Sequence, residues 1–268
     1  MRIKTASCIA AACFMAACAN VSTTRPGVVG VDRSQYLSFP VEQFDQLMAD
    51  SYASMMSEAG TNHDLNQDEA LLKRVRTIAQ RMIPHTEIFR SDAPGWEWEV
   101  NVIRSQQMNA LCFGKGKIVF FSGLIENLML TDNEIAAIMG HEIAHVLREH
   151  NREKASQRSR SKFLTGLLGA VVGGDEDELA HLSALFYMLP NSREQETEAD
   201  RMGLELAARA GYDSSAAIAV WRKFQHVTGK GQPVQFWSTH PSHESRLKDL
   251  QNYSEKVAAS YNQMQQKK

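Results

Sequence analysis

The spacing of apolar residues along the chain predicts a body that is mainly helical. Apolar side chains recur every three or four residues over residues 41–58 and again over residues 68–83. This period places them on one face of an amphipathic helix. Four later stretches have the same helical spacing, and they cover residues 176–189, 192–210, 214–226 and 241–261.

Two shorter stretches predict strands and one capped helix. Residues 96–103 alternate between apolar and polar side chains, and residues 117–121 form a short apolar run after two glycines. A helix then begins after Thr131, because Thr131 and Glu134 have the capping-box spacing, and we expect it to continue to His150. The prediction is an α+β fold, mainly α-helical, with a small β-sheet beside this helix.

The first residues have the layout of a secretory signal. A positively charged start precedes a small, apolar run that is shorter than the about 20 residues needed to cross a membrane. Met15-Ala16-Ala17-Cys18 resembles a bacterial lipobox, in which the cysteine is lipidated. We expect residues 1–17 to be a signal peptide, Cys18 to carry the lipid anchor, and residues 18–40 to form a tether. The alternative is ordinary cleavage, which leaves a soluble periplasmic protein.

Charge and cysteine usage narrow the class of protein. The chain has 268 residues and a formal net charge of −2, which argues against a dedicated nucleic-acid binder. Three of the four cysteines lie within the first 18 residues, so a disulfide framework is not expected, and with Cys18 lipidated Cys112 has no partner. We expect Cys112 to be a buried, inert thiol rather than a reactive one. By resemblance to lipidated bacterial proteins, Ala19 after the lipobox favours the outer membrane. Residues 256–268 are expected to be a polar tail.

The capped helix carries a candidate zinc site. In His141-Glu142-Ile143-Ala144-His145 the two histidines are four residues apart, so both imidazoles project from one side of the helix. That separation suits two corners of a tetrahedral zinc ion. Glu142, beside the first ligand, can take a proton from a water molecule at the metal.

A third protein ligand has to come from another helix. The metzincin pattern needs Gly and His further along the same helix, where the chain has Arg148 and Asn151 instead, and His150 is one residue out of place. The acidic group Glu194, Glu196, Glu198 and Asp200 is the obvious source of the ligand.

One of these three glutamates fits the ligand role better than the others. Only Glu196 has an aspartate four residues later, Asp200, which could orient a ligand histidine from behind. Gly203 would allow this helix to approach the helix that carries the two histidines.

Three motifs resemble those of one known family. Residues 192–200 read S-R-E-Q-E-T-E-A-D, which is similar to the S-R-x-x-E-x-E-A-D signature of the HtpX and CAAX-prenyl-protease family of zinc metalloproteases. Residues 109–124 contain N-A, G-K-I and S-G-L in the family's order, and residues 239–247 contain T-H-P and R-L. The resemblance is closest to a periplasmic lipoprotein branch.

The resemblance implies a gluzincin-type metalloprotease domain over residues 41–255, with one Zn²⁺ per chain. It implies that Glu196 is the third ligand after His141 and His145, and that Asp200 supports a histidine. Glu142 is the expected general base.

Two further residues are candidates for polarising the peptide carbonyl. His240 and Arg246 both lie in the matched C-terminal segment. His240 has an alternative role as a fourth zinc ligand that holds the enzyme inactive, and Arg246 has an alternative role in a structural ion pair.

The residues before the zinc helix are the candidate substrate site. We expect the strand at residues 117–121 to pair with an extended substrate by β-addition. The expected substrate-binding residues are Asn109, Ala110, Lys117, Ile118 and Val119.

The expected function is that of an endopeptidase of the bacterial cell envelope, acting on misfolded or misassembled proteins. The alternative is a chaperone-like assembly factor that binds the same clients and rarely cuts them. The expected partners are unfolded protein substrates and, through Cys18, the membrane on its periplasmic side. The sequence does not indicate an oligomeric state.

Overall fold

The computed structural model describes residues 20–166, 190–229, 234–241 and 244–266. Its helices are α2 (Val41–Thr61), α3 (Glu69–Met82), α4 (Ser122–Asn127), α5 (Asp132–Leu147), α6 (His150–Gly166), α8 (Arg193–Arg209), α9 (Ala216–Gly229), α10 (Gln235–Thr239) and α11 (Glu244–Gln266). Its strands are β1 (Asn20–Val21), β2 (Gln35–Tyr36), β3 (Glu99–Ile103), β4 (Ala110–Phe113) and β5 (Lys117–Phe121), with short 3-10 turns at Ile83–Ile88 and Ala93–Gly95. The α+β class, dominated by helix, is confirmed.

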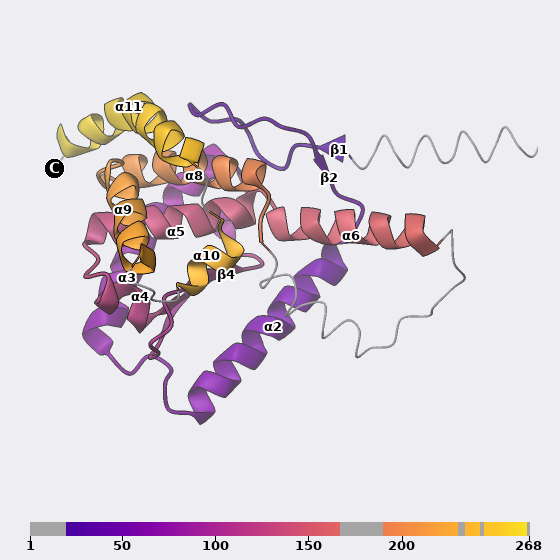
Figure 1. Cartoon of the computed structure of the whole chain (residues 1–268), viewed down its shortest axis with the longest axis horizontal. Helices are drawn as coiled ribbons and strands as arrows, with labels where there is room; N and C mark the ends of the chain where they lie inside the picture. The colour runs from indigo at the N-terminus through magenta and orange to yellow at the C-terminus, as the bar shows by residue number, and fades with distance from the viewer. Residues whose placement is uncertain (1–19, 167–189, 230–233, 242–243, 267–268) are drawn as a thin grey trace, which may run out of the picture.

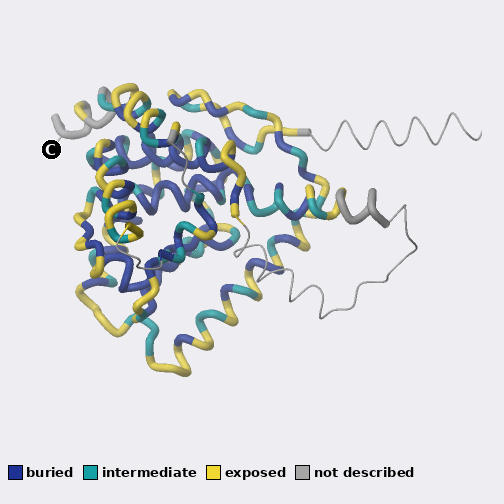
Figure 2. The backbone as a smooth tube through the Cα atoms, in the orientation of Figure 1, coloured by how far each residue is buried: buried dark blue, intermediate teal, exposed yellow. Residues whose placement is uncertain are grey.

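Helices α5 and α8 form the centre of the molecule. They lie against one another, and α3, α9, α11 and the sheet surround them (Figure 1). Both are buried along most of their length, as the dark blue tube shows (Figure 2). Apolar residues of α3 such as Val75, Ile78 and Met82 belong to the same core. Burial of this apolar surface holds the two central helices in place.

The N-terminus of each central helix is fixed by a capping box. Thr131 accepts from the Glu134 amide and Glu134 bonds back to the Thr131 amide, as the sequence predicts. Ser192 and Gln195 form the same reciprocal pair at the start of α8. Since each box satisfies two of the amides that helix geometry leaves unpaired, both helices have fixed starting points.

The main sheet has three strands in the order β3-β5-β4. β3 is parallel to β5, and β4 is antiparallel to it, with Ala110 opposite Phe120. β5 is therefore the central strand and has no free edge, so our prediction that residues 117–121 pair with a substrate is wrong. β4 was not predicted, because its four residues are all buried and show no alternation.

The helix that carries the two histidines is shorter than predicted. It ends at Leu147, and α6 begins at His150. Between them Glu149 has a φ of 52°, a left-handed conformation that ends an α-helix. The Glu149 carboxylate is bound by Arg90 and by Arg152, each at 2.7 Å, which holds this break.

The segment that we expected to form a tether lies against the body in its described part, residues 20–40. Val29 and Val31 are buried in the main core. Glu205 of α8 accepts hydrogen bonds from the amides of Val28 and Val29, at 2.9 and 3.2 Å. The chain from β1 to β2 is thus packed over α8 and the start of α6 (Figure 1).

Several predictions fall on residues outside the described ranges. These are the signal peptide, the lipidated Cys18 and the helix at residues 176–189. Among the described helices, none has the length and apolar character needed to cross a membrane.

Candidate metal centre and active site

Four buried side chains from three helical elements converge on one point. His141 and His145 come from α5, Glu196 from α8, and His240 from the end of α10. One ligand atom from each lies within 4.8 Å of all the others. His145 Nε2 is 3.0 Å from His141 Nε2 and 3.2 Å from Glu196 Oε1, and His240 Nδ1 is 2.9 Å from the same oxygen.

The chemistry of this group fits zinc. Three imidazole nitrogens and a carboxylate are the ligand types that Zn²⁺ binds in catalytic sites. Two imidazole nitrogens 3.0 Å apart, with a carboxylate oxygen beside them, offer more lone pairs than protons to share. A cation placed between these atoms accepts all of their lone pairs at once. The three predicted ligands are brought together, and His240 joins them.

Glu142 lies beside the cluster with one oxygen unused. It is 4% exposed, and its Oε1 has no hydrogen-bond partner among the described residues. His240 Nε2 is 3.3 Å from that oxygen, although not in hydrogen-bond geometry. Burial raises the pKa of Glu142, and the nearby His240 and His141 oppose this shift. A carboxylate whose pKa is raised toward neutrality is suited to accept and release a proton.

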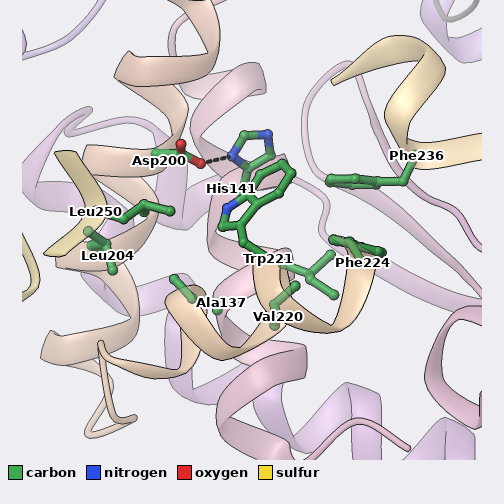
Figure 3. Close-up of a pocket in the computed structure, with 11 residues that line it drawn as sticks. Ala137, His141, Asp200, Leu204, Val220, Trp221, Phe224, Phe236 and Leu250 are labelled. Carbon is green, nitrogen blue, oxygen red and sulfur yellow. Dashed lines mark hydrogen bonds and ion pairs between the residues drawn. The ribbon is translucent and has the colours of Figure 1, made fainter. Parts of the chain in front are cut away.

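Asp200 and Arg246 support the ligands from behind. Asp200 Oδ1 is 2.9 Å from His141 Nδ1, the nitrogen that faces away from the cluster (Figure 3). Arg246 binds both Asp200 oxygens, and its Nη1 is 2.6 Å from Glu196 Oε2. Arg246 is thus tied to two carboxylates and buried, so the structure places it as an orienting residue rather than one that contacts a substrate carbonyl.

An aromatic group fixes the remaining ligand. The ring of Phe236 stacks on His240 at 4.2 Å and on Phe224 at 5.2 Å between centroids. Arg246 lies 3.7 Å above the Trp221 ring. Figure 3 shows this aromatic group beside His141 and Asp200. Because these rings pack against one another, the His240 imidazole has little freedom to leave the cluster.

A cleft opens onto the cluster and contains two polar residues that the sequence analysis missed. Lys154 and Asn191 line it together with Glu142 and His240. Asn191 Nδ2 donates to Glu196 Oε1 at 2.7 Å, and Lys154 Nζ donates to Asn191 Oδ1 at the same distance. Burial chiefly lowers the pKa of Lys154, to about 8. Neither residue belongs to a spacing pattern, so neither could be recognised from the sequence.

The predicted substrate-binding residues do not line the cleft. Ile118 and Val119 are fully buried in the central strand, and the Lys117 ammonium bonds to the Glu97 carbonyl at 2.7 Å. Ala110 begins the edge strand β4, and Asn109 precedes it. The cleft is lined instead by Leu111 and Cys112 of that strand.

The main-chain groups of β4 alternate in direction. The Asn109 carbonyl accepts from the Phe121 amide at 3.1 Å. In an antiparallel ladder, Leu111 then also bonds to β5, while the amide and carbonyl of Cys112 point to the free edge. Among the described residues, β4 therefore has no strand paired with its outer edge, which lies beside the cleft.

The cleft continues into a cavity of about 130 Å³. Cys112, His145 and Asn151 line both spaces. The cavity walls combine apolar side chains, among them Phe44, Met48 and Trp96, with charged ones such as Arg90 and Lys115.

The chain is similar to known metallopeptidases. Residues 69–254, more than half of the chain, match peptidase family M48. The mitochondrial metalloendopeptidase OMA1 of Arabidopsis thaliana is 37% identical over 65% of this chain and 36% of its own length. The OMA1 enzyme of Schizosaccharomyces pombe is 32% identical, over 78% of this chain and 61% of its own length. The beta-barrel assembly-enhancing protease of Escherichia coli is 28% identical, over 70% and 40% respectively.

These similarities agree with the site at the level of the family. The chain spans only between about a third and three fifths of the length of these relatives. They include mitochondrial and bacterial proteins, so the lipoprotein branch stays a prediction. The matched region contains the whole four-residue cluster and Glu142. The chain therefore belongs to peptidase family M48, a family of zinc metallopeptidases.

Proposed function

We propose that this protein is a zinc-dependent endopeptidase. The observation that carries the proposal is the buried Glu142. Its Oε1 has no hydrogen-bond partner among the described residues and lies beside the cluster of His141, His145, Glu196 and His240. A site that only held a structural metal would have no use for an unsatisfied, buried carboxylate at this position. The membership in a peptidase family supports the same activity.

The residues of the site have separable chemical roles. Zinc held by His141, His145 and Glu196 would supply a Lewis acid that acidifies a water molecule and polarises the substrate carbonyl. Glu142 takes the proton of the attacking water on its free oxygen and later passes it to the leaving amine. Asp200 and Arg246 keep the ligands oriented throughout.

His240 has two open roles, because its two nitrogens face different groups. Nδ1 lies in the ligand cluster and Nε2 faces Glu142. If His240 is a fourth ligand, His240→Ala should raise the zinc dissociation constant. If His240 instead stabilises the charge on the carbonyl oxygen, the same variant should lower kcat and leave zinc affinity unchanged.

The substrates we propose are extended, unfolded protein segments. The free edge of β4 at Cys112 can pair with the backbone of such a segment, whatever its sequence. The apolar part of the adjoining cavity, formed by Phe44, Met48 and Trp96, favours an apolar side chain. Unfolded proteins expose both an unpaired backbone and apolar side chains, whereas folded proteins bury them.

The proposed place of action is the periplasmic side of the bacterial envelope, with misassembled envelope proteins as clients. The lipobox-like run ending at Cys18 supports this location. The similarity to a protein named beta-barrel assembly-enhancing protease is consistent with it. A Cys18→Ala chain should lose its association with membranes, and one that still partitions with them would rule out the lipid anchor.

The test of the activity is the variant Glu142→Gln. It should bind one zinc per chain as the parent does and should lose cleavage of an unfolded protein, because the amide cannot accept the proton. Glu126→Gln, an exposed position on α4, is the matched control and should cleave normally. Proteolysis that survives in Glu142→Gln would refute the mechanism. A parent protein that binds unfolded clients without cutting them would favour the chaperone-like alternative.

A further inference from the structure

The two nitrogens of the His145 ring have different partners. Nε2 is the atom that joins the cluster, 3.2 Å from Glu196 Oε1. Nδ1 lies on the opposite side and is 2.8 Å from Nδ1 of His150. Both rings are buried, and His150 is fully so. His150 thus stands behind His145 as Asp200 stands behind His141.

The contacts continue from His150 to a carboxylate. His150 Nε2 is 3.0 Å from Glu198 Oε2. Two guanidinium groups bind the same carboxylate, since Arg33 Nε is 2.7 Å from Oε1 and Arg148 Nη2 is 3.3 Å from Oε2. These contacts keep Glu198 ionised and fix its position.

This order of partners determines where the protons lie. An ionised carboxylate only accepts hydrogen bonds, so Nε2 of His150 must carry a proton. In a neutral ring, Nδ1 of His150 is then an acceptor, and the proton between the two rings belongs to His145 Nδ1. That leaves a lone pair on His145 Nε2, the nitrogen that faces the cluster. A doubly protonated His150 would force a proton onto that nitrogen and block a metal.

The helix break between α5 and α6 allows His150 to contact His145. On an uninterrupted helix, a residue five positions on points roughly 140° away from the first. His150 nevertheless faces His145, because Glu149 takes the left-handed conformation with a φ of 52°. Such a conformation is strained for a non-glycine residue, so the fold retains strain at the position that aims His150.

We propose that His150 is a positioning residue for the metal ligand His145. With Glu198 it fixes the tautomer and the ring orientation of His145, as Asp200 does for His141. Arg33 binds Glu198 from the N-terminal segment, so the chain between β1 and β2 supports the metal centre as well (Figure 1). This inference rests on the proposed metal site.

Two variants of His150 separate its two contacts. In His150→Gln the amide reaches the place of Nε2 and can still donate to Glu198, but His145 Nδ1 loses its acceptor. In His150→Asn the amide oxygen takes the place of Nδ1, so His145 keeps its acceptor and the link to Glu198 is lost. We expect His150→Gln to raise the zinc dissociation constant about 10–100-fold, the usual effect of losing an outer partner, and His150→Asn to stay nearer the parent. His226→Gln, at an exposed histidine of α9, is the control.

Zinc affinity is measured by competition with a chelator, and folding of the metal-free proteins by thermal unfolding. The absorption of the Co²⁺-substituted protein reports the ligand geometry, which a merely structural defect would not change. An unchanged dissociation constant in a folded His150→Gln protein would overturn the inference. A parent protein that binds no zinc would refute the proposed function itself. A parent that binds zinc, with an unaffected His150→Gln variant, would refute only this inference, so the two failures are distinguishable.

One measurement needs no variant. Imidazole ¹⁵N shifts of the zinc-loaded parent report which nitrogen of each ring carries a proton. We expect His150 to be neutral and protonated at Nε2, and His145 to be protonated at Nδ1. A His150 ring protonated at Nδ1 would overturn the inference even if the His150 variants do not fold.

Discussion

Gly203 of α8 lies so close to α5 that a Cβ atom on it would stand 2.7 Å from the backbone nitrogen of His141. A Cβ on Gly140 would in turn stand 2.7 Å from the Gly203 carbonyl oxygen. The two central helices therefore touch backbone to backbone at this pair. The contact lies beside His141 and two helical turns from Glu196, so it sets how closely the ligands of the two helices approach. The sequence analysis anticipated this role for Gly203.

Gly203→Ala should destabilise the protein and weaken zinc binding together. The new methyl group has backbone on its far side, which cannot move as a side chain can, so we expect a loss of about 1–3 kcal/mol in the free energy of unfolding. Denaturant unfolding and chelator competition measure the two effects. Gly60→Ala is the matched control, because a Cβ there meets nothing within 4 Å and should stabilise helix α2 by about 1 kcal/mol. Equal changes in unfolding free energy and in zinc affinity for the two variants would show that α5 and α8 can separate freely.

The choice of third ligand is tested by a pair of substitutions two residues apart. Glu196→Gln should sharply reduce zinc content, because the buried carboxylate within the cluster is replaced by a weaker, neutral donor. Glu194→Gln should leave zinc content unchanged, because Glu194 is exposed on the first turn of the same helix. Metal analysis of the purified proteins decides between them, and the reverse result would contradict the assignment.

The parts of the site that could be predicted are those that local spacing determines. Two histidines four residues apart on a capped helix lie on one side of it wherever that helix packs. In the same way, Glu196 and Asp200 are one turn apart on α8 and reach the same histidine, and Glu142 follows from its place beside His141.

The parts that could not be predicted depend on contacts between distant segments. Arg33 and Glu198 are 165 residues apart in the chain, and no periodicity relates them. The break at Glu149 depends on Arg90, which comes from another part of the fold. The edge strand β4 is buried on both faces, so its residues carry no alternating pattern. Lys154 lies on α6, after the break at Glu149, so its place in the cleft depends on that break.

The N-terminal segment should contribute to stability through Arg33. Its guanidinium binds Glu153 at 2.6 Å, and Glu153 is almost fully buried. Arg33→Ala should lower the free energy of unfolding at pH 7 by about 2 kcal/mol, as expected for hydrogen bonds to a charged group. Arg104→Ala is the control, because the ion pair of Arg104 with Asp64 is mostly exposed and should contribute less than about 1 kcal/mol. Urea unfolding measures both.

The effect of Arg33→Ala should also depend on pH. Burial alone would raise the pKa of Glu153, but hydrogen bonds from Arg33, Gln35 and Gln195 outweigh it and hold this pKa below its usual value. A carboxylate whose pKa is lowered by folding stabilises the protein above its unfolded pKa of about 4.3 and loses this contribution as the pH falls through the folded pKa. The difference between parent and Arg33→Ala should therefore shrink on acidification below about pH 4. A constant difference would show that Glu153 is not the responsible partner.

Cys112 should be unreactive in the folded protein. Its thiol is buried, and burial, with the charge of Glu142, raises its pKa well above the usual value. Since the thiolate is the nucleophile, alkylation by iodoacetamide at pH 8 should be at least about tenfold slower than in the unfolded chain. Mass spectrometry of the peptide that contains Cys112 measures this, with the protein unfolded in urea as the reference. Equal rates would mean that the Cys112 thiol is exposed in the folded protein.

Lys154 should assist the reaction by placing a positive charge in the cleft. It lies there with Glu142 and His240, its pKa of about 8 leaves it mostly charged at neutral pH, and it fixes the Asn191 amide by a 2.7 Å hydrogen bond. A cation there can stabilise negative charge that develops on the substrate carbonyl oxygen. We expect Lys154→Met to lower kcat about 100-fold, with KM and zinc content near those of the parent.

The control for this prediction is Lys73→Met, at an exposed position on α3 that is remote from the cleft. A second readout is the affinity for a phosphinic peptide, whose tetrahedral, anionic group imitates the charge of the transition state. Lys154→Met should lose affinity for this inhibitor by about the factor by which kcat falls, because both depend on the same charge. If zinc is lost instead, or if inhibitor affinity is unchanged while kcat falls, Lys154 acts on the structure of the site and not on the developing charge.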